Sequence, residues 1–381
     1  MNDIFVKKIH IEKLRYLENV TIDISSDEKK HLILTGKNGS GKTTLLDSLR
    51  LEYSPHYYGA NHIWTADFGT FNDCHLINNE HVKLKVFYGL LDVDATYPFD
   101  CMTIFFGAYR KLKLHVPSTI ETVDVENRNI SVDDFLKYLV LLNYQKLDAL
   151  ANDNLMKANE IKNWFNMLEG VLREIFNTND LTLVHNSKDL TFKVAIPGRE
   201  PFGFNEMADG YSTFLDIVFS IMMKMESKAS MTYDMPGIVF IDEIEAHLHV
   251  ELQRLILPFL VKMFPRIQFI VTTHSPFIIS SLRNAVVFDL ERQIRVEDMS
   301  NYSYEAVIEH YYDLNQYSKE ANRQFEIYRT LLDKADRTPD ESEAFINART
   351  YLRQVPAGAA QELVNEFNRM EAKRKDIAAN G

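Results

Sequence analysis

The sequence predicts an α/β fold around a mixed or parallel β-sheet, because three short apolar segments each end in polar residues. His31–Thr35 reads HLILT, Gly237–Ile241 reads GIVFI, and residues 267–271 read IQFIV. Such runs are typical of strands that are buried on both faces of a sheet. Doubly wound sheets bind ligands beyond the carboxyl ends of their strands, so we expect the polar residues there to form one site.

A glycine-rich segment, GKNGSGKTT, separates the first predicted strand from leucines at helical spacing. This is the strand-to-helix context that the P-loop pattern requires, which disfavours a chance match. The backbone N–H groups of the turn and the positive end of the helix dipole would bind phosphate groups. The lysine would reach the β- and γ-phosphates of a nucleotide, and the first threonine would ligate Mg²⁺. The predicted nucleotide-binding residues are Gly36, Lys37, Asn38, Gly39, Ser40, Gly41, Lys42, Thr43 and Thr44.

Polar residues also follow the second and third predicted strands. Asp242 would hold the Mg²⁺ shell and Glu243 would polarise the attacking water, whereas alone such a pair could equally mark an exposed helix start. His274 follows the third strand, where an imidazole can contact the γ-phosphate and sense its loss. A lone histidine is more often structural, but its place at a strand end favours a function. The predicted catalytic residues are Lys42, Glu243 and His274, and the predicted metal ligands are Thr43 and Asp242.

The order of these motifs resembles that of ABC-type ATPases. IDEIEAHLH followed by TTHSP is similar to a soluble branch that includes SMC and RecF proteins, overcoming-lysogeny nucleases, and the ATPase subunits of anti-phage systems such as Septu, PARIS and retron-associated systems. The opening IFVKKIHIEKLRYLENVTIDI resembles the two strands that begin these chains. The resemblance covers about residues 4–290. It implies an ABC-ATPase head, with ATP and Mg²⁺ as cofactors.

The resemblance also implies a head-to-tail dimer, in which a signature segment contacts the γ-phosphate held by the opposite subunit. MADGYS at residues 207–212 is the counterpart of that signature, but it departs from the family pattern. Ala208 stands at the serine position and Asp209 replaces a glycine, whereas Gly210 fits. Ser212 or backbone amides would have to substitute, or the contact with the opposite subunit would be weak. The alternative is an ordinary helix cap before the apolar residues 211–225.

Arg110 follows the predicted strand Met102–Phe106, roughly where the family has its glutamine loop. It could contact phosphate or couple the core to an inserted lobe, and it could equally be a solvated charge at a strand end. Residues 245–248 correspond to the D-loop, which lines the dimer interface in the family.

A divalent-metal hydrolase site is a competing interpretation of the same region. Carboxylates and imidazoles at close spacing can converge on one metal ion. The P-loop and the family resemblance already account for these residues, so we disfavour this interpretation. The residues concerned are Asp242, Glu243, Glu245, His247 and His249.

Four regions are expected: two parts of the ATPase core at 1–120 and 201–300, a helical lobe with a hairpin at 121–200, and a helical extension at 301–381. Ser131 and Asp134 resemble a capping box before a helix at 132–144. Helical spacing continues over 154–176, but that helix would span only about 33 Å, too short for a coiled-coil arm. The extension predicts three or four helices, broken at Pro339 and Pro356, and is either a packing cap or a docking platform. It shows no second catalytic cluster, so an effector would be another polypeptide.

Composition narrows the functional classes. The net charge of −12 over 381 residues argues against nonspecific coating of DNA, although nucleic-acid binding by a local basic surface at residues 110–115 stays open. Cys74 and Cys101 form no CxxC pattern, which argues against a disulfide framework and a zinc hook. Neither a signal peptide nor an apolar stretch that could span a membrane is found, so we expect a cytoplasmic location.

The expected function is that of an ATP-binding and ATP-hydrolysing subunit that dimerises, or forms a higher oligomer, on ATP. The resemblance implies the sensor or regulatory ATPase of a prokaryotic anti-phage defence complex, which controls a separate effector such as a nuclease or toxin. One alternative is a RecF-like DNA-repair ATPase, which DNA-stimulated turnover would identify. Another is a non-hydrolysing scaffold that holds ATP as a structural ligand.

Overall fold

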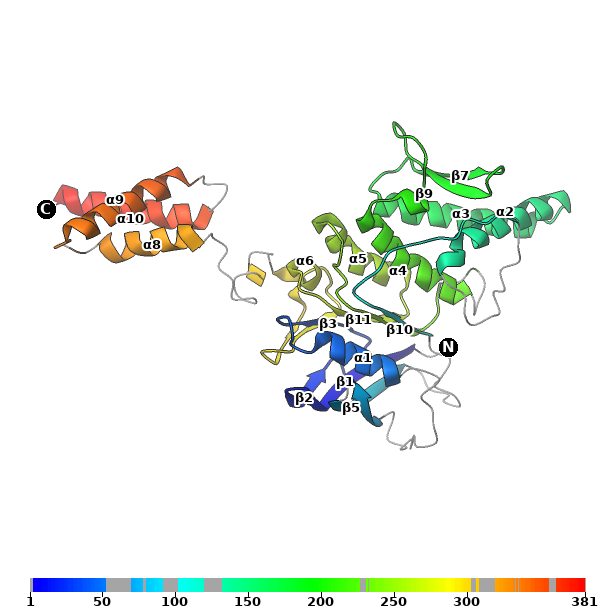
Figure 1. Cartoon of the computed structure of the whole chain (residues 1–381), viewed down its shortest axis with the longest axis horizontal. Helices are drawn as coiled ribbons and strands as arrows, with labels where there is room; N and C mark the ends of the chain where they lie inside the picture. Colours follow the sequence, from blue (N-terminus) through cyan, green and yellow to red (C-terminus); the bar gives the residue numbers. More distant parts are fainter. Residues whose placement is uncertain are drawn as a thin grey trace. The chain divides into compact units, whose positions relative to one another are not determined.

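The computed structural model of the chain describes residues 3–52, 70–77, 80–91, 102–119, 132–226, 231, 233–302, 306–307, 319–332, 334, 336–355 and 361–380. The chain divides into two compact units, Met1–Tyr302 and Ser303–Gly381. Figure 1 shows the sheets and the helices α1 to α6 in the first unit, and α8 to α10 in the second. The four-part division expected from the sequence stays a prediction.

The first unit contains a six-stranded sheet with the order β13-β12-β3-β11-β10-β6. Its five strands from β12 to β6 are parallel, and only the edge strand β13 pairs in the antiparallel direction. Every residue of β3, β10 and β11 is buried, as expected for apolar runs covered on both faces. The predicted mixed α/β sheet is confirmed. The strands are β3 His31–Thr35, β6 Met102–Phe106, β10 Gly237–Ile241, β11 Ile267–Thr272, β12 Ala285–Asp289 and β13 Ile294–Glu297.

A second, antiparallel sheet has the order β2-β1-β5-β4. Helix α1, Lys42–Glu52, lies beside this sheet in Figure 1, and its leucines join one buried apolar cluster with residues of both sheets. The two strands expected at the start of the chain are confirmed. The strands are β1 Asp3–Leu14, β2 Leu17–Asp23, β4 Thr70–Ile77 and β5 Glu80–Leu91.

A helical lobe is inserted between β6 and β10. Helices α2, Phe135–Ala151, and α3, Leu155–Ile175, pack side by side, and the hairpin of β7 and β8 is as predicted. Helix α2 extends beyond its predicted end at residue 144 to Ala151, and Asp153, two residues later, has a positive φ of 56° that breaks the helical path. The predicted capping box includes Ser131, which lies outside the described residues. The remaining elements are η2 Val132–Asp134, β7 Thr182–Asn186, β8 Thr191–Ala195, β9 Phe202–Gly203, η3 Phe204–Glu206 and α4 Asp209–Glu226.

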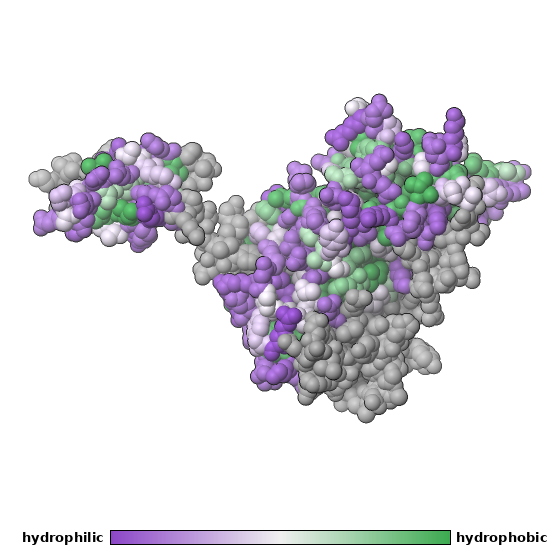
Figure 2. All heavy atoms as spheres, viewed as in Figure 1, coloured by the Kyte–Doolittle hydropathy of each residue, from purple (hydrophilic) through white to green (hydrophobic). Residues whose placement is uncertain are grey.

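Apolar side chains are visible over the lobe in Figure 2. The exposed apolar residues of its helical hairpin include Leu147, Leu155 and Met156. Along the rest of the first unit, α5 covers Val250–Met263, α6 covers Pro276–Ile279 and η4 covers Met299–Asn301. Among the described residues, no helix is long and apolar enough to cross a membrane.

The second unit contains three helices over its described residues, α8 Lys319–Leu332, α9 Pro339–Gln354 and α10 Gln361–Asn380. Helix α9 begins at Pro339, as the predicted break implies, whereas Pro356 lies outside the described residues. A buried cluster that includes Tyr328 and Phe345 joins the helices. Glu371 accepts hydrogen bonds from Arg349, Tyr328 and Arg353. Burial opposes its ionisation, but these bonds hold the pKa of Glu371 at about 2.

Candidate nucleotide site

The predicted P-loop lies between β3 and α1, at the carboxyl end of a central strand. Gly36, Gly39 and Gly41 have φ values of 132°, 85° and 92°, which only glycine adopts easily. A Cβ atom on Gly36 would lie 2.9 Å from the Ser40 hydroxyl oxygen. The glycines are therefore required by the backbone path, as an anion-binding turn demands.

Lys42 begins α1, and its side chain folds back over the loop. Its Nζ donates hydrogen bonds to the carbonyl oxygens of Gly36, at 2.8 Å, and Lys37, at 3.1 Å. Burial lowers the pKa of Lys42, while nearby carboxylates led by Asp242 oppose that shift. The buried Ser40 hydroxyl has no hydrogen-bond partner among the described residues. A buried donor of this kind, beside a lysine and positive-φ glycines, fits a phosphate group.

Asp242 joins the P-loop to the sheet, although 199 residues separate it from Thr43. Its Oδ2 accepts a hydrogen bond of 2.9 Å from the Thr43 hydroxyl, and its Oδ1 accepts one of 2.6 Å from the Thr272 hydroxyl. Mg²⁺ is bound in proteins through oxygen ligands, carboxylates above all, and in P-loop proteins also through the threonine hydroxyl. The neighbouring oxygens of Thr43 and Asp242 would therefore hold Mg²⁺.

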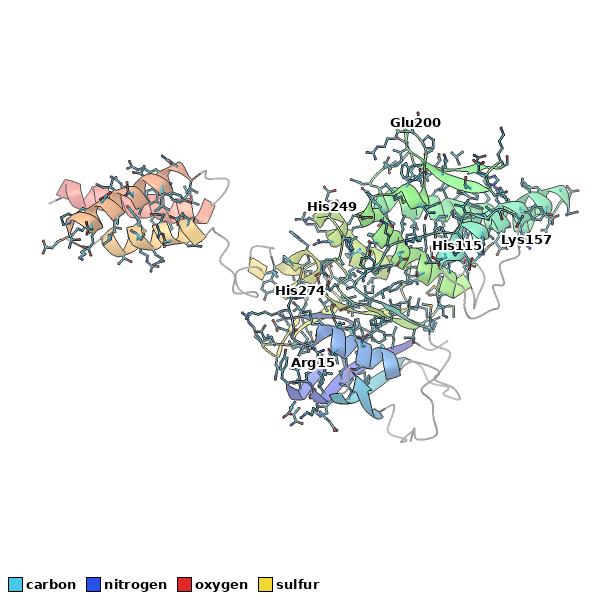
Figure 3. All side chains as sticks on the ribbon, in the orientation of Figure 1. Arg15, His115, Lys157, Glu200, His249 and His274 are labelled. Atoms are coloured by element: carbon cyan, nitrogen blue, oxygen red, sulfur yellow. The ribbon has the colours of Figure 1, made fainter. Side chains whose placement is uncertain are left out.

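Glu243 and His274 line the same open hollow as Lys37 and Asn38, with a volume of about 690 Å³. Figure 3 shows His274 beyond the end of the sheet. Glu243 has a positive φ of 45°, an uncommon conformation that often marks functional sites. Burial lowers the pKa of His274, and the charge of Lys42 acts in the same direction. The structure thus brings the predicted catalytic side chains to one edge of the sheet, while their roles stay predictions.

Arg110 is buried, with only 5% of its surface exposed. Its Nη1 donates hydrogen bonds to the carbonyl oxygens of Gly107 and Asp242, and its Nη2 donates to the carbonyl oxygen of Glu243. The alternative of a solvated charge at a strand end is therefore wrong. Burial also removes Arg110 from the basic surface that was considered for nucleic acid, and the exposed Lys111 forms an ion pair with Asp209.

The competing metal site is not formed. Within the described part of the chain, which includes all five residues concerned, no group of three or more His, Cys, Asp or Glu side chains could hold a metal ion. Glu245 instead accepts a hydrogen bond from the backbone N–H of His274. His247 and His249 are both exposed. His247 lies in the turn after β10, and His249 is the N-cap residue of α5.

The signature-like segment differs from its expected arrangement at Ser212. This residue is only 3% exposed, and its hydroxyl oxygen accepts a hydrogen bond of 3.1 Å from the backbone N–H of Leu112. The expectation that Ser212 replaces the missing serine is corrected, because the hydroxyl is buried within its own subunit. Ala208 and Asp209 are exposed at the start of α4. Gly210 lets α4 approach the D-loop, since a Cβ atom there would lie 3.2 Å from the carbonyl oxygen of His247.

Thr272 is a site residue that the sequence interpretation did not identify. Its hydroxyl donates to Asp242 and also accepts a hydrogen bond of 2.7 Å from the backbone N–H of Glu243. The sequence shows that Thr272 ends a predicted strand. It does not show that this strand lies next to the strand that carries Asp242 and Glu243, which became clear only from the strand order.

Two protein-family models match the chain. One is described as "AAA domain, putative AbiEii toxin, Type IV TA system" and matches residues 114–280. The other is described as "AAA domain" and matches residues 8–193. Over residues 8–280 the chain is therefore similar to AAA-type ATPase domains, in agreement with the P-loop and the paired carboxylates at the sheet edge.

The chain is similar in sequence to a Septu protein and to a probable ATPase of a retron. "Septu protein PtuA" of Bacillus mycoides (strain KBAB4) is 27% identical over 307 residues, which are 73% of this chain and 39% of that protein. "Retron Ec83 probable ATPase" of Escherichia coli is 25% identical over 374 residues, which are 71% of this chain and 68% of that protein. The match thus spans well under half of the Septu protein.

Solved structures that match the chain include an SMC head domain from Thermotoga maritima. It is 13% identical, with a TM-score of 0.39, over 74% of this chain and 94% of that structure. The ATP-bound recombination mediator protein RecF is 14% identical, with a TM-score of 0.33, over 78% of this chain and 99% of that structure.

Proposed function

We propose that this chain binds and hydrolyses ATP with Mg²⁺, and that it is the sensor or regulatory ATPase of a prokaryotic anti-phage defence complex. ATP binding closes two copies head to tail, and hydrolysis reopens them and resets a separate effector such as a nuclease or toxin. The observation that carries the proposal is the hydrogen bond between Thr43 and Asp242, since it unites the P-loop with the strand that delivers Glu243.

Each side chain at the sheet edge has a distinct task in this proposal. Lys42 leaves the loop carbonyls to bind the β- and γ-phosphates, and the loop amides hold the same groups. Thr43 and Asp242 hold Mg²⁺, which neutralises the phosphate charge when bound. Glu243 orients the attacking water and accepts its proton, while His274 contacts the γ-phosphate. The hollow lined by Glu243 and His274 supports this division of tasks.

The proposed dimer places the start of α4 over the nucleotide of the opposite copy. Because the Ser212 hydroxyl is already bonded, the contact would come from the backbone amides near Ala208 and Asp209. The similarity to a Septu protein and to a probable ATPase of a retron supports a defence role with a separate effector.

Purification of the tagged chain from its host, with and without a nonhydrolysable ATP analogue, tests the effector role. We expect one nuclease or toxin to copurify in stoichiometric amount, and its retention to change with the analogue. A Lys42→Ala chain run in parallel should lose that dependence. Recovery of the chain alone under both conditions would contradict the assignment of a separate effector.

A second candidate, the ATP-bound scaffold, is favoured by the burial of Ser212, because the signature then lacks a hydroxyl that faces the nucleotide. Phosphate release measured over hours distinguishes the two functions. Turnover by the wild-type protein that Glu243→Gln removes supports the ATPase. Stoichiometric bound ATP without phosphate release supports the scaffold.

A further inference from the structure

We propose that Arg110 is a positioning residue that fixes the main chain of Glu243 and joins it to the start of α4. The inference rests on the proposed function, in which Glu243 orients the attacking water. Arg110 would act through the backbone and would not itself contact the nucleotide.

The guanidinium of Arg110 lies where the chain leaves β10. Strand β6 pairs with β10, and the N–H of Asp242 donates to the carbonyl oxygen of Phe106 at 2.8 Å. Beyond this point the carbonyl oxygens of Asp242 and Glu243 turn toward Arg110, whose Nη1 and Nη2 lie 2.6 Å and 2.8 Å from them. The planar fork of arginine can bind two adjacent carbonyl oxygens at once, which a lysine ammonium does less rigidly.

The backbone of Glu243 needs such support because its φ of 45° is unfavourable for a residue with a side chain. Conformations of this kind persist only when the surroundings fix them. The N–H of Glu243 donates to the Thr272 hydroxyl at 2.7 Å, and its carbonyl oxygen accepts from Arg110 and from the N–H of Ala246. Arg110 and Thr272 therefore hold the two sides of the residue whose carboxylate lines the hollow.

Burial of Arg110 is not explained by stability alone. Its Nε–H has no acceptor in the described part of the chain, and a buried unpaired donor destabilises a fold. A whole buried ion pair can often be replaced by apolar side chains without loss of stability, so a buried charge is weak evidence for a stabilising role. Burial lowers the pKa of Arg110. Nearby carboxylates oppose this shift, first Asp216 of α4 and then Asp242, Glu245 and Glu243. The guanidinium is bonded to the turn after β10, while the carbonyl oxygen of the same residue is bonded to Thr213 of α4.

The same segment is attached to the start of α4. The carbonyl oxygen of Arg110 accepts a hydrogen bond of 3.4 Å from the Thr213 hydroxyl, and the N–H of Leu112 donates to Ser212. Lys111 forms an ion pair of 2.8 Å with Asp209. A displacement of the start of α4 when two copies close would therefore be transmitted through Arg110 to Glu243.

The test compares Arg110→Met with Arg110→Lys, and uses Arg199→Met as the matched control because Arg199 is exposed in a turn between β8 and β9. For Arg110→Met we expect kcat to fall about 10–100-fold, as for a misplaced catalytic group, while the Kd for ATP changes less than about threefold. Arg110→Lys should recover part of the loss. Arg199→Met should leave kcat and Kd unchanged.

A double variant distinguishes a positioning role from an independent one. If Arg110 acts through Glu243, Arg110→Met combined with Glu243→Gln should have a kcat within about threefold of Glu243→Gln alone. Losses that multiply would overturn the proposal, as would an Arg110→Met enzyme with normal kcat. A parallel loss of ATP affinity would make Arg110 a phosphate ligand instead. If Arg110→Met does not fold, Arg110→Lys carries the same comparison.

The outcome also separates this inference from the proposed function. Wild-type protein that binds ATP but releases no phosphate rejects the ATPase and, with it, the role of Arg110. Wild-type turnover that depends on Glu243, together with multiplying losses, rejects only the role of Arg110.

Discussion

The P-loop side of the site and the start of α4 are two halves of one expected composite site, and they are built differently. On the P-loop side, the polar groups of Thr43, Asp242 and Thr272 bond to one another at the edge of the sheet. At the start of α4, the polar groups bond to the segment after β6, and the Ser212 hydroxyl is buried. The polar groups of the first half are ordered by bonds to one another, as the proposed nucleotide site requires, whereas the second half is bonded to a neighbouring segment and leaves the helix start exposed.

This difference indicates how the two halves can share the work. Groups that are already ordered before the ligand arrives contribute more to its affinity, because binding does not have to order them. The start of α4 contributes only after another copy approaches, and its contact with the Arg110 segment can report that approach. Substitutions on the P-loop side should therefore change binding or chemistry, while those at the start of α4 should change mainly stability or coupling.

Glu243→Gln should give the largest effect. We expect kcat to fall about 10²–10⁴-fold, because a positioned general base is lost, while ATP still binds. Light scattering should then show an ATP-dependent increase from the mass of a single 44.3 kDa chain toward that of a dimer. Glu251→Gln, at an exposed position of α5, is the control. Unchanged mass with ATP would count against closure of two copies.

Lys42→Ala should come next, with ATP affinity reduced about 100-fold or more, because a buried cation that faces phosphate is removed. Titration calorimetry measures the change. Lys262→Ala removes a largely exposed lysine that pairs with Glu174 and should leave affinity as it is. Equal ATP affinity of the Lys42→Ala and wild-type proteins would place the nucleotide elsewhere.

A threonine-to-valine substitution in each half compares how much the two halves contribute to the free energy of unfolding. Thr272→Val leaves Asp242 Oδ1 and the Glu243 N–H without their shared partner, so the free energy of unfolding should fall by about 2–3 kcal/mol. Thr213→Val removes only a long hydrogen bond of 3.4 Å, and its effect should stay below about 1 kcal/mol. Urea unfolding of both variants measures these two losses in free energy of unfolding. Equal losses would show that the two halves are equally ordered.

Ser212→Ala should have a small effect that is confined to stability. The buried N–H of Leu112 loses its acceptor, which should lower the free energy of unfolding by about 1–2 kcal/mol. ATP affinity and kcat should change little. A large fall in kcat with unchanged stability would instead restore Ser212 as a ligand of the partner's nucleotide, and the contrast between the two halves would disappear.

Much of this arrangement followed from local patterns in the sequence. The strands β3, β6 and β10 were predicted with their observed bounds, because each is a short, mainly apolar run that stops at a glycine or at Asp242. The P-loop was predicted equally well, since its backbone conformation requires glycine at positions that the sequence shows directly. The end of α2 was predicted too early, because the left-handed residue that stops the helix is Asp153 and not a glycine or proline.

The sequence by itself determined the kind of fold and the residue types at the edge of the sheet, since burial and turn geometry leave a local pattern. Only the tertiary structure decided which distant groups bond to one another. Arg110 reaches carbonyl oxygens 132 and 133 residues away, and Leu112 reaches a hydroxyl 100 residues away. A polar atom takes whichever partner the packed elements bring within hydrogen-bond distance, and no local pattern records that choice.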